Sequence, residues 1–334
     1  MALKANLIYV HLGTNSSPTL LNYSSLAVKD YPSIKCFLIT DEPQVWKSFP
    51  GQVIDASSYL RTLYPWMWRM KHYEKFSVAG GYWINTLSRL FTFELVRPFV
   101  NPSELVIHVE SDNLVFPIPR YIETLTRSIM KTSICAVERE RGIASVVIAP
   151  NIETLISSMS QLKDVALSSK RWLTDMELLG EGLRSGLLAS LSPLPIQGEG
   201  GKDFLVFDGF EYGPYLFGLD PIHQGGMSQG GFESPTLRTT GLDGIWEMEK
   251  GMEQRSDVLV FRHMNQKYFL FNLHVHAKLQ FDSLSINSSI WRLTIDAANR
   301  VREFPRFENS TFSLFHKNNG TLLARLIRFI KSRP

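Results

Sequence analysis

Two short apolar segments near the N-terminus, with a helical stretch between them, constrain the fold more than any other feature of the sequence. Leu7–Leu12 and Ile34–Thr40 have the β-branched and aromatic character of buried strands, and Thr19–Val28 between them is helical in pattern. Strand, helix and strand joined by short connections form the βαβ unit of a parallel sheet. The sequence therefore predicts an α/β fold whose ligands bind at the carboxyl ends of the strands, where His11 and Asp41 fall.

Composition narrows the class of protein without identifying it. The chain has 334 residues, of which 44% are hydrophobic, so it can form one large α/β domain or two smaller ones. A net charge of +3 is too near neutral to indicate nucleic-acid binding, and we expect no nucleic-acid partner. Two cysteines, Cys36 and Cys135, exclude a disulfide scaffold and a four-cysteine zinc site. With neither a long apolar run nor an evident signal peptide, we expect a cytoplasmic protein.

A longer helical pattern opens after two glycines and runs from Tyr82 to about Arg97, where Pro98 stops it. Its apolar residues recur at helical spacing and predict a core-facing stripe of Trp83, Leu87, Leu90, Phe91 and Leu95. Asn85 and Arg89, four residues apart, fall on another face of the same helix. This face is free to contribute to a site.

The most informative segment is a strand, Leu105–Val109, that runs into Glu110-Ser111-Asp112-Asn113. The strand delivers two carboxylates, two residues apart, to the loop at its end, and strand alternation predicts that both point to one side. Such a pair can share one divalent cation, because Mg²⁺ and Mn²⁺ prefer hard oxygen ligands. A solvated acidic turn is the alternative explanation, and for an isolated pair of acids it is the commoner one.

A second segment places two imidazoles two residues apart, at His274 and His276, and Lys278 continues the alternation. On a strand these three side chains project from one face, where they can contact a metal or an anionic phosphate together. A third segment, from Phe207 to Pro221, mixes glycines with aromatic residues. Such a mixture permits close approach to a sugar ring. Its acidic residues are candidates for a general base, unless they merely cap turns: Asp208, Glu211 and Asp220.

These motifs, in this order, resemble those of nucleotide-sugar-dependent glycosyltransferases of the GT-A type. In that fold a nucleotide-binding half is followed by a strand ending in a D-x-D motif that binds metal and diphosphate. Glu110-Ser111-Asp112 occupies this place, with glutamate instead of the usual first aspartate. The resemblance implies a Rossmann-type, mostly parallel sheet flanked by helices. It also implies donor contacts from a set of five residues: His11, Asp41, Arg89, Asp112 and Lys278.

The resemblance further implies a metal site and a reaction. A late histidine, His274 or His276, would complete the shell that Glu110 and Asp112 begin, around Mn²⁺ or Mg²⁺. The activity implied is transfer of a sugar from a nucleoside-diphosphate donor to a hydroxyl of a glycan or lipid-linked acceptor. Whether the transfer inverts or retains configuration stays open.

We expect the chain to consist of a catalytic domain with two halves and a C-terminal extension. Residues 1–285 would form the catalytic domain, with a nucleotide-binding half of about 1–116 and an acceptor-side half of about 117–285. Residues 286–334 would form an extension that ends in a basic amphipathic helix, Leu322–Ile330. That helix either contacts the inner face of a membrane peripherally or packs on its own domain.

Two other classes of protein keep much of this pattern. A nucleotidyltransferase acting on sugar phosphates also uses a parallel sheet and paired acids. It would usually carry a glycine-rich phosphate loop with a nearby lysine, and the segment after Gly13 lacks both features. A non-catalytic carbohydrate-binding protein with the same fold is the second alternative. It would fold normally and show no metal-dependent hydrolysis of nucleotide sugars.

Overall fold

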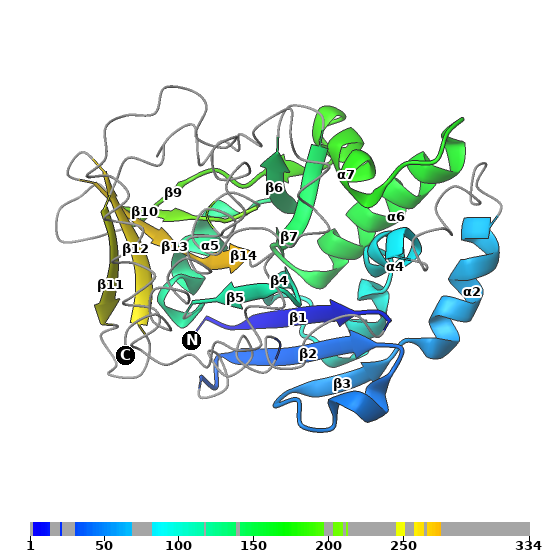
Figure 1. Cartoon of the computed structure of the whole chain (residues 1–334), viewed down its shortest axis with the longest axis horizontal. Helices are drawn as coiled ribbons and strands as arrows, with labels where there is room; N and C mark the ends of the chain where they lie inside the picture. The colour runs from blue at the N-terminus through cyan, green and yellow to red at the C-terminus, as the bar shows by residue number, and fades with distance from the viewer. Residues whose placement is uncertain are drawn as a thin grey trace, which may run out of the picture.

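The computed structural model describes residues 3–13, 21, 31–68, 82–116, 118–137, 141–196, 203–209, 212, 245–250, 257–263 and 266–274. Their centre is a seven-stranded sheet in the spatial order β3-β2-β1-β4-β7-β6-β8 (Figure 1). Its strands are β1 (Ala5–His11), β2 (Ile34–Thr40), β3 (Gln52–Asp55), β4 (Leu105–Glu110), β6 (Ser133–Val137), β7 (Arg141–Ala149) and β8 (Ala189–Ser190). The first four are mutually parallel, and only β7 runs against its neighbours in this sheet. The predicted mostly parallel α/β sheet is confirmed.

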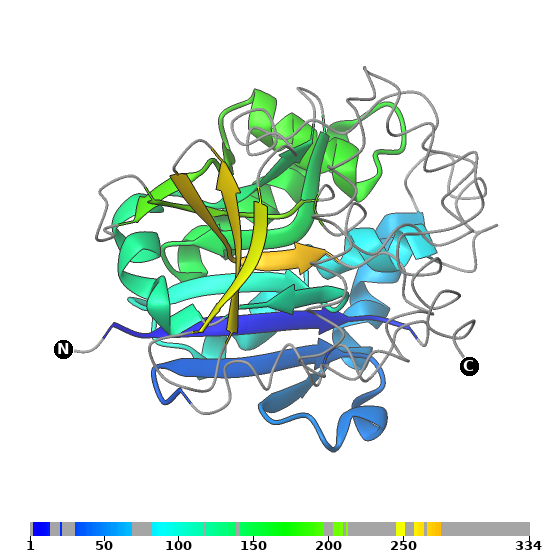
Figure 2. The ribbon, with the colours of Figure 1, turned by 60° about the vertical axis from the view of Figure 1, so that its left-hand side comes forward.

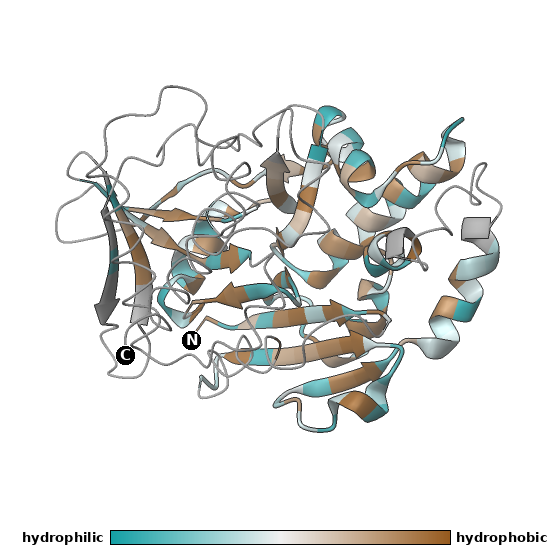
Figure 3. Cartoon of the chain, viewed as in Figure 1, coloured by the Kyte–Doolittle hydropathy of each residue, from teal (hydrophilic) through white to brown (hydrophobic). Residues whose placement is uncertain are grey.

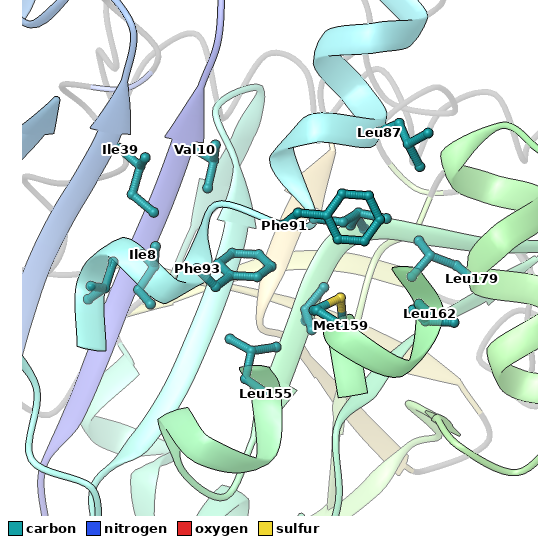
Figure 4. Close-up of a cluster of buried hydrophobic side chains, with 14 of the residues drawn as sticks. Ile8, Val10, Ile39, Leu87, Phe91, Phe93, Leu155, Met159, Leu162 and Leu179 are labelled. Carbon is teal, nitrogen blue, oxygen red and sulfur yellow. The ribbon is translucent and has the colours of Figure 1, made fainter. Parts of the chain in front are cut away.

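Helices cover one face of this sheet: α2 (Ser57–Trp68), α4 (Tyr82–Arg89), the 3-10 helix η2 (Phe93–Phe99), α6 (Ile152–Ser168) and α7 (Asp175–Arg184). Figure 4 shows side chains of β1 and β2 directed toward those of η2 and α6. The side chains in this cluster are buried. Full burial of each large aliphatic side chain here stabilises the fold by roughly 1.5–3 kcal/mol. This layer holds α4 and α7 firmly beside the carboxyl ends of the strands.

The opposite face packs against the short helices η1 (Pro43–Trp46), η3 (Ile118–Arg120) and α5 (Ile122–Ser128) and against a second, five-stranded sheet (Figure 2). That sheet has the order β11-β12-β13-β10-β9. Its strands are β9 (Leu194–Ile196), β10 (Asp203–Val206), β11 (Ile245–Lys250), β12 (Asp257–His263) and β13 (Gln266–Leu270). Because the central strands are covered on both faces, they are apolar along their length, as the hydropathy colouring of Figure 3 shows.

A third, two-stranded pairing joins distant parts of the chain. The segment after the acidic turn, β5 (Asn113–Val115), pairs antiparallel with β14 (Asn272–His274). Phe116 extends the pairing by donating its backbone N–H to the carbonyl of Phe271. The ladder therefore fixes the histidine-bearing strand next to the end of β4.

One predicted helix is shorter than its sequence pattern indicates. The helix expected over residues 82–97 ends at Arg89, because the next backbone bonds reach back three residues: Leu90 donates to Leu87 and Phe91 to Ser88. The chain then continues as η2, which contains Pro98. Of the predicted apolar stripe, Leu87, Leu90 and Phe91 are buried, and Leu95 is half-buried against the same core.

The chain between β7 and β10 adds two helices and two short strands to the structure. Helices α6 and α7 follow β7 in sequence, and the short strand β8 comes after them. Strand β9 contains Pro195, which is tolerated because β9 lies at the edge of its sheet. The predicted helices at 19–28 and 322–330 and the boundary near 285 lie outside the described residues, apart from Leu21. None of the described helices is both long and apolar enough to cross a membrane.

Candidate active site

The acidic motif lies at the end of β4, where the chain turns back on itself. Glu110 is the last residue of β4, and Asp112 lies in the turn that leads to β5. In the β5–β14 ladder His274 stands opposite Asn113, one residue after Asp112. The turn and the neighbouring strand therefore bring Glu110, Asp112 and His274 together. The sequence predicted that alternation along one strand would point Glu110 and Asp112 to the same side. That explanation is wrong, because β4 ends at Glu110 and Asp112 lies in the turn.

The three side chains form a compact group of possible metal ligands. His274 Nε2 lies 3.3 Å from Glu110 Oε2 and 3.3 Å from Asp112 Oδ1. One ligand atom from each residue falls within 4.8 Å of the others, and all three side chains are nearly buried. Since two carboxylates at this distance repel one another, the group favours a cation between them.

The orientation of the His274 ring follows from its other nitrogen. Nδ1 lies 2.5 Å from the Gly209 carbonyl, so Nδ1–H donates to that carbonyl and the lone pair of a neutral ring points from Nε2 toward the carboxylates. Burial disfavours the charged ring, but the adjacent Asp112 and Glu110 outweigh it and raise the pKa of His274 to about 9. Without a metal, the proton on Nε2 is thus the cation that the carboxylates hold.

Arg89, the last residue of α4, is tied to two acids. Its Nη1 lies 2.5 Å from Glu110 Oε1 and its Nη2 lies 3.1 Å from Asp175 Oδ2. Asp175 opens α7, where a negative charge is favoured by the helix dipole. Burial raises the pKa of Asp175, and the Arg89 guanidinium opposes that rise. Arg89 therefore holds the side of Glu110 that faces away from His274.

A second polar network lies behind His274 and contains Asp208. The Asp208 carboxylate has no exposed surface and accepts two backbone N–H groups, from Tyr212 at 3.0 Å and from His274 at 2.9 Å. The Asn272 side chain accepts from the backbone N–H of Asp208 and donates to its carbonyl. Asn272 also donates to Asn113 Oδ1 at 2.6 Å. One amide thus connects three segments.

The two expected donor residues of the first strands lie at the carboxyl edge of the same sheet. His11 ends β1, is nearly buried, and packs edge-on against Trp46 with ring centroids 5.0 Å apart. Asp41 follows β2 and accepts the backbone N–H of Gly13 at 2.9 Å. Gly13 has a φ of +83°, and a Cβ there would come within 2.8 Å of the Asn85 side chain, so this turn requires glycine.

His108, two residues before Glu110, is a further buried group that the sequence motifs did not single out. Its Nδ1 lies 2.9 Å from the Ile8 carbonyl, and its ring packs against Phe93. Burial, with the nearby Arg89, lowers the pKa of His108 to about 3, so the ring is neutral at pH 7. It belongs to the core of the sheet.

Four expected site residues lie outside the described residues: Glu211, Asp220, His276 and Lys278. Two residues of the site were missed by sequence reasoning. Asn272 lies two residues before His274, so the alternation that indicated the histidines also predicts that both point to one face. Asp175 lies in the capping box Thr174-Asp175-Met176-Glu177, which marks a helix start but gives no sign of its contact with Arg89.

No protein-family model matches the chain, and no curated protein matches it by sequence. Solved structures do resemble it, at low similarity. Mouse xyloside xylosyltransferase 1 is 12% identical with a TM-score of 0.38, over 57% of this chain and 86% of that one. The galactosyltransferase LgtC, solved with donor and acceptor sugar analogues, is 13% identical with a TM-score of 0.35, over 60% and 75%. The glycosyltransferase GlyE of Streptococcus pneumoniae TIGR4 is 16% identical with a TM-score of 0.35, over 57% of this chain and only 45% of that one. Each of these three proteins is described as a glycosyltransferase.

Proposed function

We propose that this chain is a divalent-metal-dependent glycosyltransferase that moves a sugar from a nucleoside-diphosphate donor to a hydroxyl of a glycan or lipid-linked acceptor. One observation carries the proposal. Glu110, Asp112 and His274 converge at the carboxyl edge of a parallel sheet, although 162 residues of chain separate Asp112 from His274. This edge is where α/β sheets bind their ligands, next to the point where the strand order reverses on either side of β1.

The residues present fit Mn²⁺ or Mg²⁺. Oxygen-rich ligands suit these hard cations, and one imidazole is compatible with Mn²⁺ in particular. Adjacent ligands in an octahedral shell with bonds of about 2.1 Å lie about 3 Å apart, close to the 3.3 Å separations of His274 Nε2 from the two carboxylates. A ligating histidine normally donates its other ring N–H to a carbonyl or carboxylate, as His274 does to Gly209.

The balance of charge supports the same conclusion. The buried group contains three carboxyl groups, on Glu110, Asp112 and Asp175, against the Arg89 guanidinium and, without a metal, the proton on His274. Desolvated carboxylates without matching cations are strongly unfavourable, so a bound dication would stabilise this arrangement. When bound, the metal would supply the positive charge that offsets the charge growing on a leaving diphosphate.

The protein's own residues would then hold the donor and exclude water. His11 and Asp41, at the ends of adjacent strands, are proposed to contact the nucleoside, and Arg89 the donor sugar or phosphates. Lys278 is proposed as a phosphate partner and His276 as a further ligand, although both lie outside the described residues. The base for the acceptor hydroxyl is proposed among Glu211, Asp220 and Asp208. Asp208 is enclosed, and its contacts favour a different role. Peripheral membrane contact through residues 322–330 likewise stays a proposal.

A thermal-shift screen tests the proposal most directly. A panel of nucleoside diphosphates and nucleotide sugars is added to the protein with and without Mn²⁺, and the melting temperature is recorded. A ligand present at 100 times its Kd stabilises the folded state by about 2.7 kcal/mol, and we expect this shift only when Mn²⁺ is present. Release of free sugar or nucleoside diphosphate from the stabilising donor then reports turnover.

The Asp112→Asn variant tests the metal site itself, because it keeps the shape of the side chain and removes one anionic ligand. We expect it to fold normally and to lose both the Mn²⁺-dependent shift and turnover. Full turnover in this variant, or equal stabilisation by nucleotides with and without Mn²⁺, would refute the proposed function. Binding without turnover in the unaltered chain would favour the non-catalytic alternative.

A further inference from the structure

The enclosed carboxylate of Asp208 has a role that the acidic motifs do not reveal. We propose that Asp208 is a positioning residue, which fixes the His274 backbone so that the imidazole faces the metal ligands Glu110 and Asp112. The inference rests on the proposed metal-dependent function, because it assigns His274 to the metal. It replaces a role for Asp208 as the base that accepts the acceptor's proton.

Burial and contact geometry argue against the base. Asp208 is 0% exposed, and its two oxygens accept separate backbone N–H groups: Oδ1 accepts from Tyr212 and Oδ2 from His274. A base must come within about 3 Å of the proton-bearing oxygen or reach it through one water. Because Asp208 has no exposed surface, an acceptor hydroxyl cannot come within this distance of either carboxylate oxygen.

The same contacts account for the position of the ring. His274 is fixed at three points on one side: its backbone N–H binds the Asp208 carboxylate, its Nδ1–H binds the Gly209 carbonyl, and its strand pairs with β5. Two of these three points come from adjacent residues of one turn. If the turn at residues 207–209 moves, the ring loses both its backbone anchor and its tautomer-setting acceptor.

The backbone of Asp208 is itself held by side chains of two strands, β14 and β7. Asn272 accepts from the Asp208 N–H at 3.0 Å and donates to the Asp208 carbonyl at 2.8 Å, and Ser145 on β7 donates to that same carbonyl at 3.1 Å. Because Asn272 also donates to Asn113, the turn is coupled to the segment that follows Asp112. Partners that orient a metal ligand typically change metal affinity 10- to 100-fold when they are removed.

The test compares Asp208→Asn with the unaltered chain and with Asp203→Asn, an acid on β10 outside this network. Titration calorimetry with Mn²⁺ is expected to show a Kd about 10- to 100-fold higher for Asp208→Asn and unchanged for Asp203→Asn. Ser145→Ala, a milder change that keeps the carboxylate, is expected to raise the Kd by about threefold, and it serves if Asp208→Asn does not fold.

Two further measurements separate positioning from proton transfer. Saturating Mn²⁺ should restore most of the turnover of Asp208→Asn, whereas loss of a base would leave turnover low at every Mn²⁺ concentration. Long-range ¹H–¹⁵N spectra of the metal-free protein, recorded above pH 9 where the ring is neutral, should show the remaining His274 proton at Nδ1 in the unaltered chain. The variant should lose this signature.

The outcomes distinguish the two proposals. Native Mn²⁺ affinity in Asp208→Asn, or turnover that Mn²⁺ does not restore, overturns the positioning role and leaves the metal-dependent function standing. No Mn²⁺ binding by the unaltered chain overturns the proposed function. In that case, an unchanged His274 spectrum in Asp208→Asn overturns the positioning of the ring as well.

Discussion

Two glutamates mark the two ends of β4, Glu104 just before it and Glu110 as its last residue. Both are 9% exposed, but they have different charged neighbours. Glu104, just before the strand, accepts from the Asn6 side chain at 3.2 Å and faces the half-exposed Lys35 at 3.7 Å. Glu110, the last residue of the strand, lies against Arg89 and shares its site with Asp112 and His274. The amino edge pairs one acid with one cation, whereas the carboxyl edge gathers more acids than cations.

The difference separates a polar cluster whose charges are balanced from one in which acids outnumber cations. At the amino edge the cation keeps its contact with water, so the pair contributes little and needs no further ligand. At the carboxyl edge the acids are nearly buried and share their partners. Arg89 contacts both Glu110 and Asp175, and His274 contacts both Glu110 and Asp112. Such an arrangement is stable only with an additional cation, which is either the proton on His274 or a metal.

Replacing the cation of the carboxyl edge should have the largest effect. Arg89→Met leaves Glu110 and Asp175 buried without their shared partner, and we expect a loss of about 3–5 kcal/mol in the free energy of unfolding. Urea denaturation measures it. The exposed pair Arg97–Glu153 is the control, and Arg97→Met should lose at most about 1 kcal/mol. Equal losses in the two variants would show that the buried cluster contributes no more than a surface pair.

Exchanging each glutamate for glutamine tests the comparison itself. Glu110→Gln removes one of the proposed metal ligands, and we expect the affinity of the protein for Mn²⁺ to fall by about 100-fold in titration calorimetry, with a similar fall in turnover. Glu104→Gln has the same burial and the same chemical change, and it should leave both quantities at their native values. If Glu104→Gln weakens Mn²⁺ binding as much, the assignment of the metal to the carboxyl edge is wrong.

The pH dependence of stability should distinguish the two edges more modestly. The folded-state pKa of His274, about 9, lies above the ordinary histidine pKa of 6.5. Its contribution to the stability of the metal-free protein is therefore complete below pH 6.5 and is lost as the pH rises through 9. We expect the melting temperature to fall by several degrees over this window, and His274→Gln to flatten the fall. The amino-edge group of Asn6, Lys35 and Glu104 contains no histidine to titrate there. A melting temperature that rises over the same window would contradict the raised pKa.

The smallest effect is expected at the amino edge. The Lys35 side chain is 49% exposed and lies 3.7 Å from Glu104, so Lys35→Met should change the free energy of unfolding by less than about 1 kcal/mol. Glu104 keeps its contact with Asn6 in that variant. A loss comparable to that of Arg89→Met would remove the distinction between the two edges.

Much of the N-terminal part of the seven-stranded sheet could be predicted from local pattern. The buried strands β1, β2 and β4 are continuous apolar runs, and the acids follow β4 directly in sequence. The antiparallel β7 and the short β3 were not predicted. The periodicity of β7 (RGIASVVIA) does not distinguish a central strand from a buried helical segment, and β3 is only four residues long. The early end of α4 also escaped prediction, because a change to 3-10 bonding leaves the spacing of apolar residues nearly intact.

The sequence by itself determined the alternation of strands and helices, the pair of carboxylates after β4 and the histidine at position 274, because these features depend on neighbours within a few residues. Only the tertiary structure decided that Arg89 joins Glu110 to Asp175, that Asp208 is enclosed behind His274, and that β14 lies beside the acidic turn. Those contacts bridge separations of 21 to 162 residues along the chain, and no local pattern encodes which distant strand a segment will pair with. Burial then decides which of the polar groups brought together must share a proton or a cation.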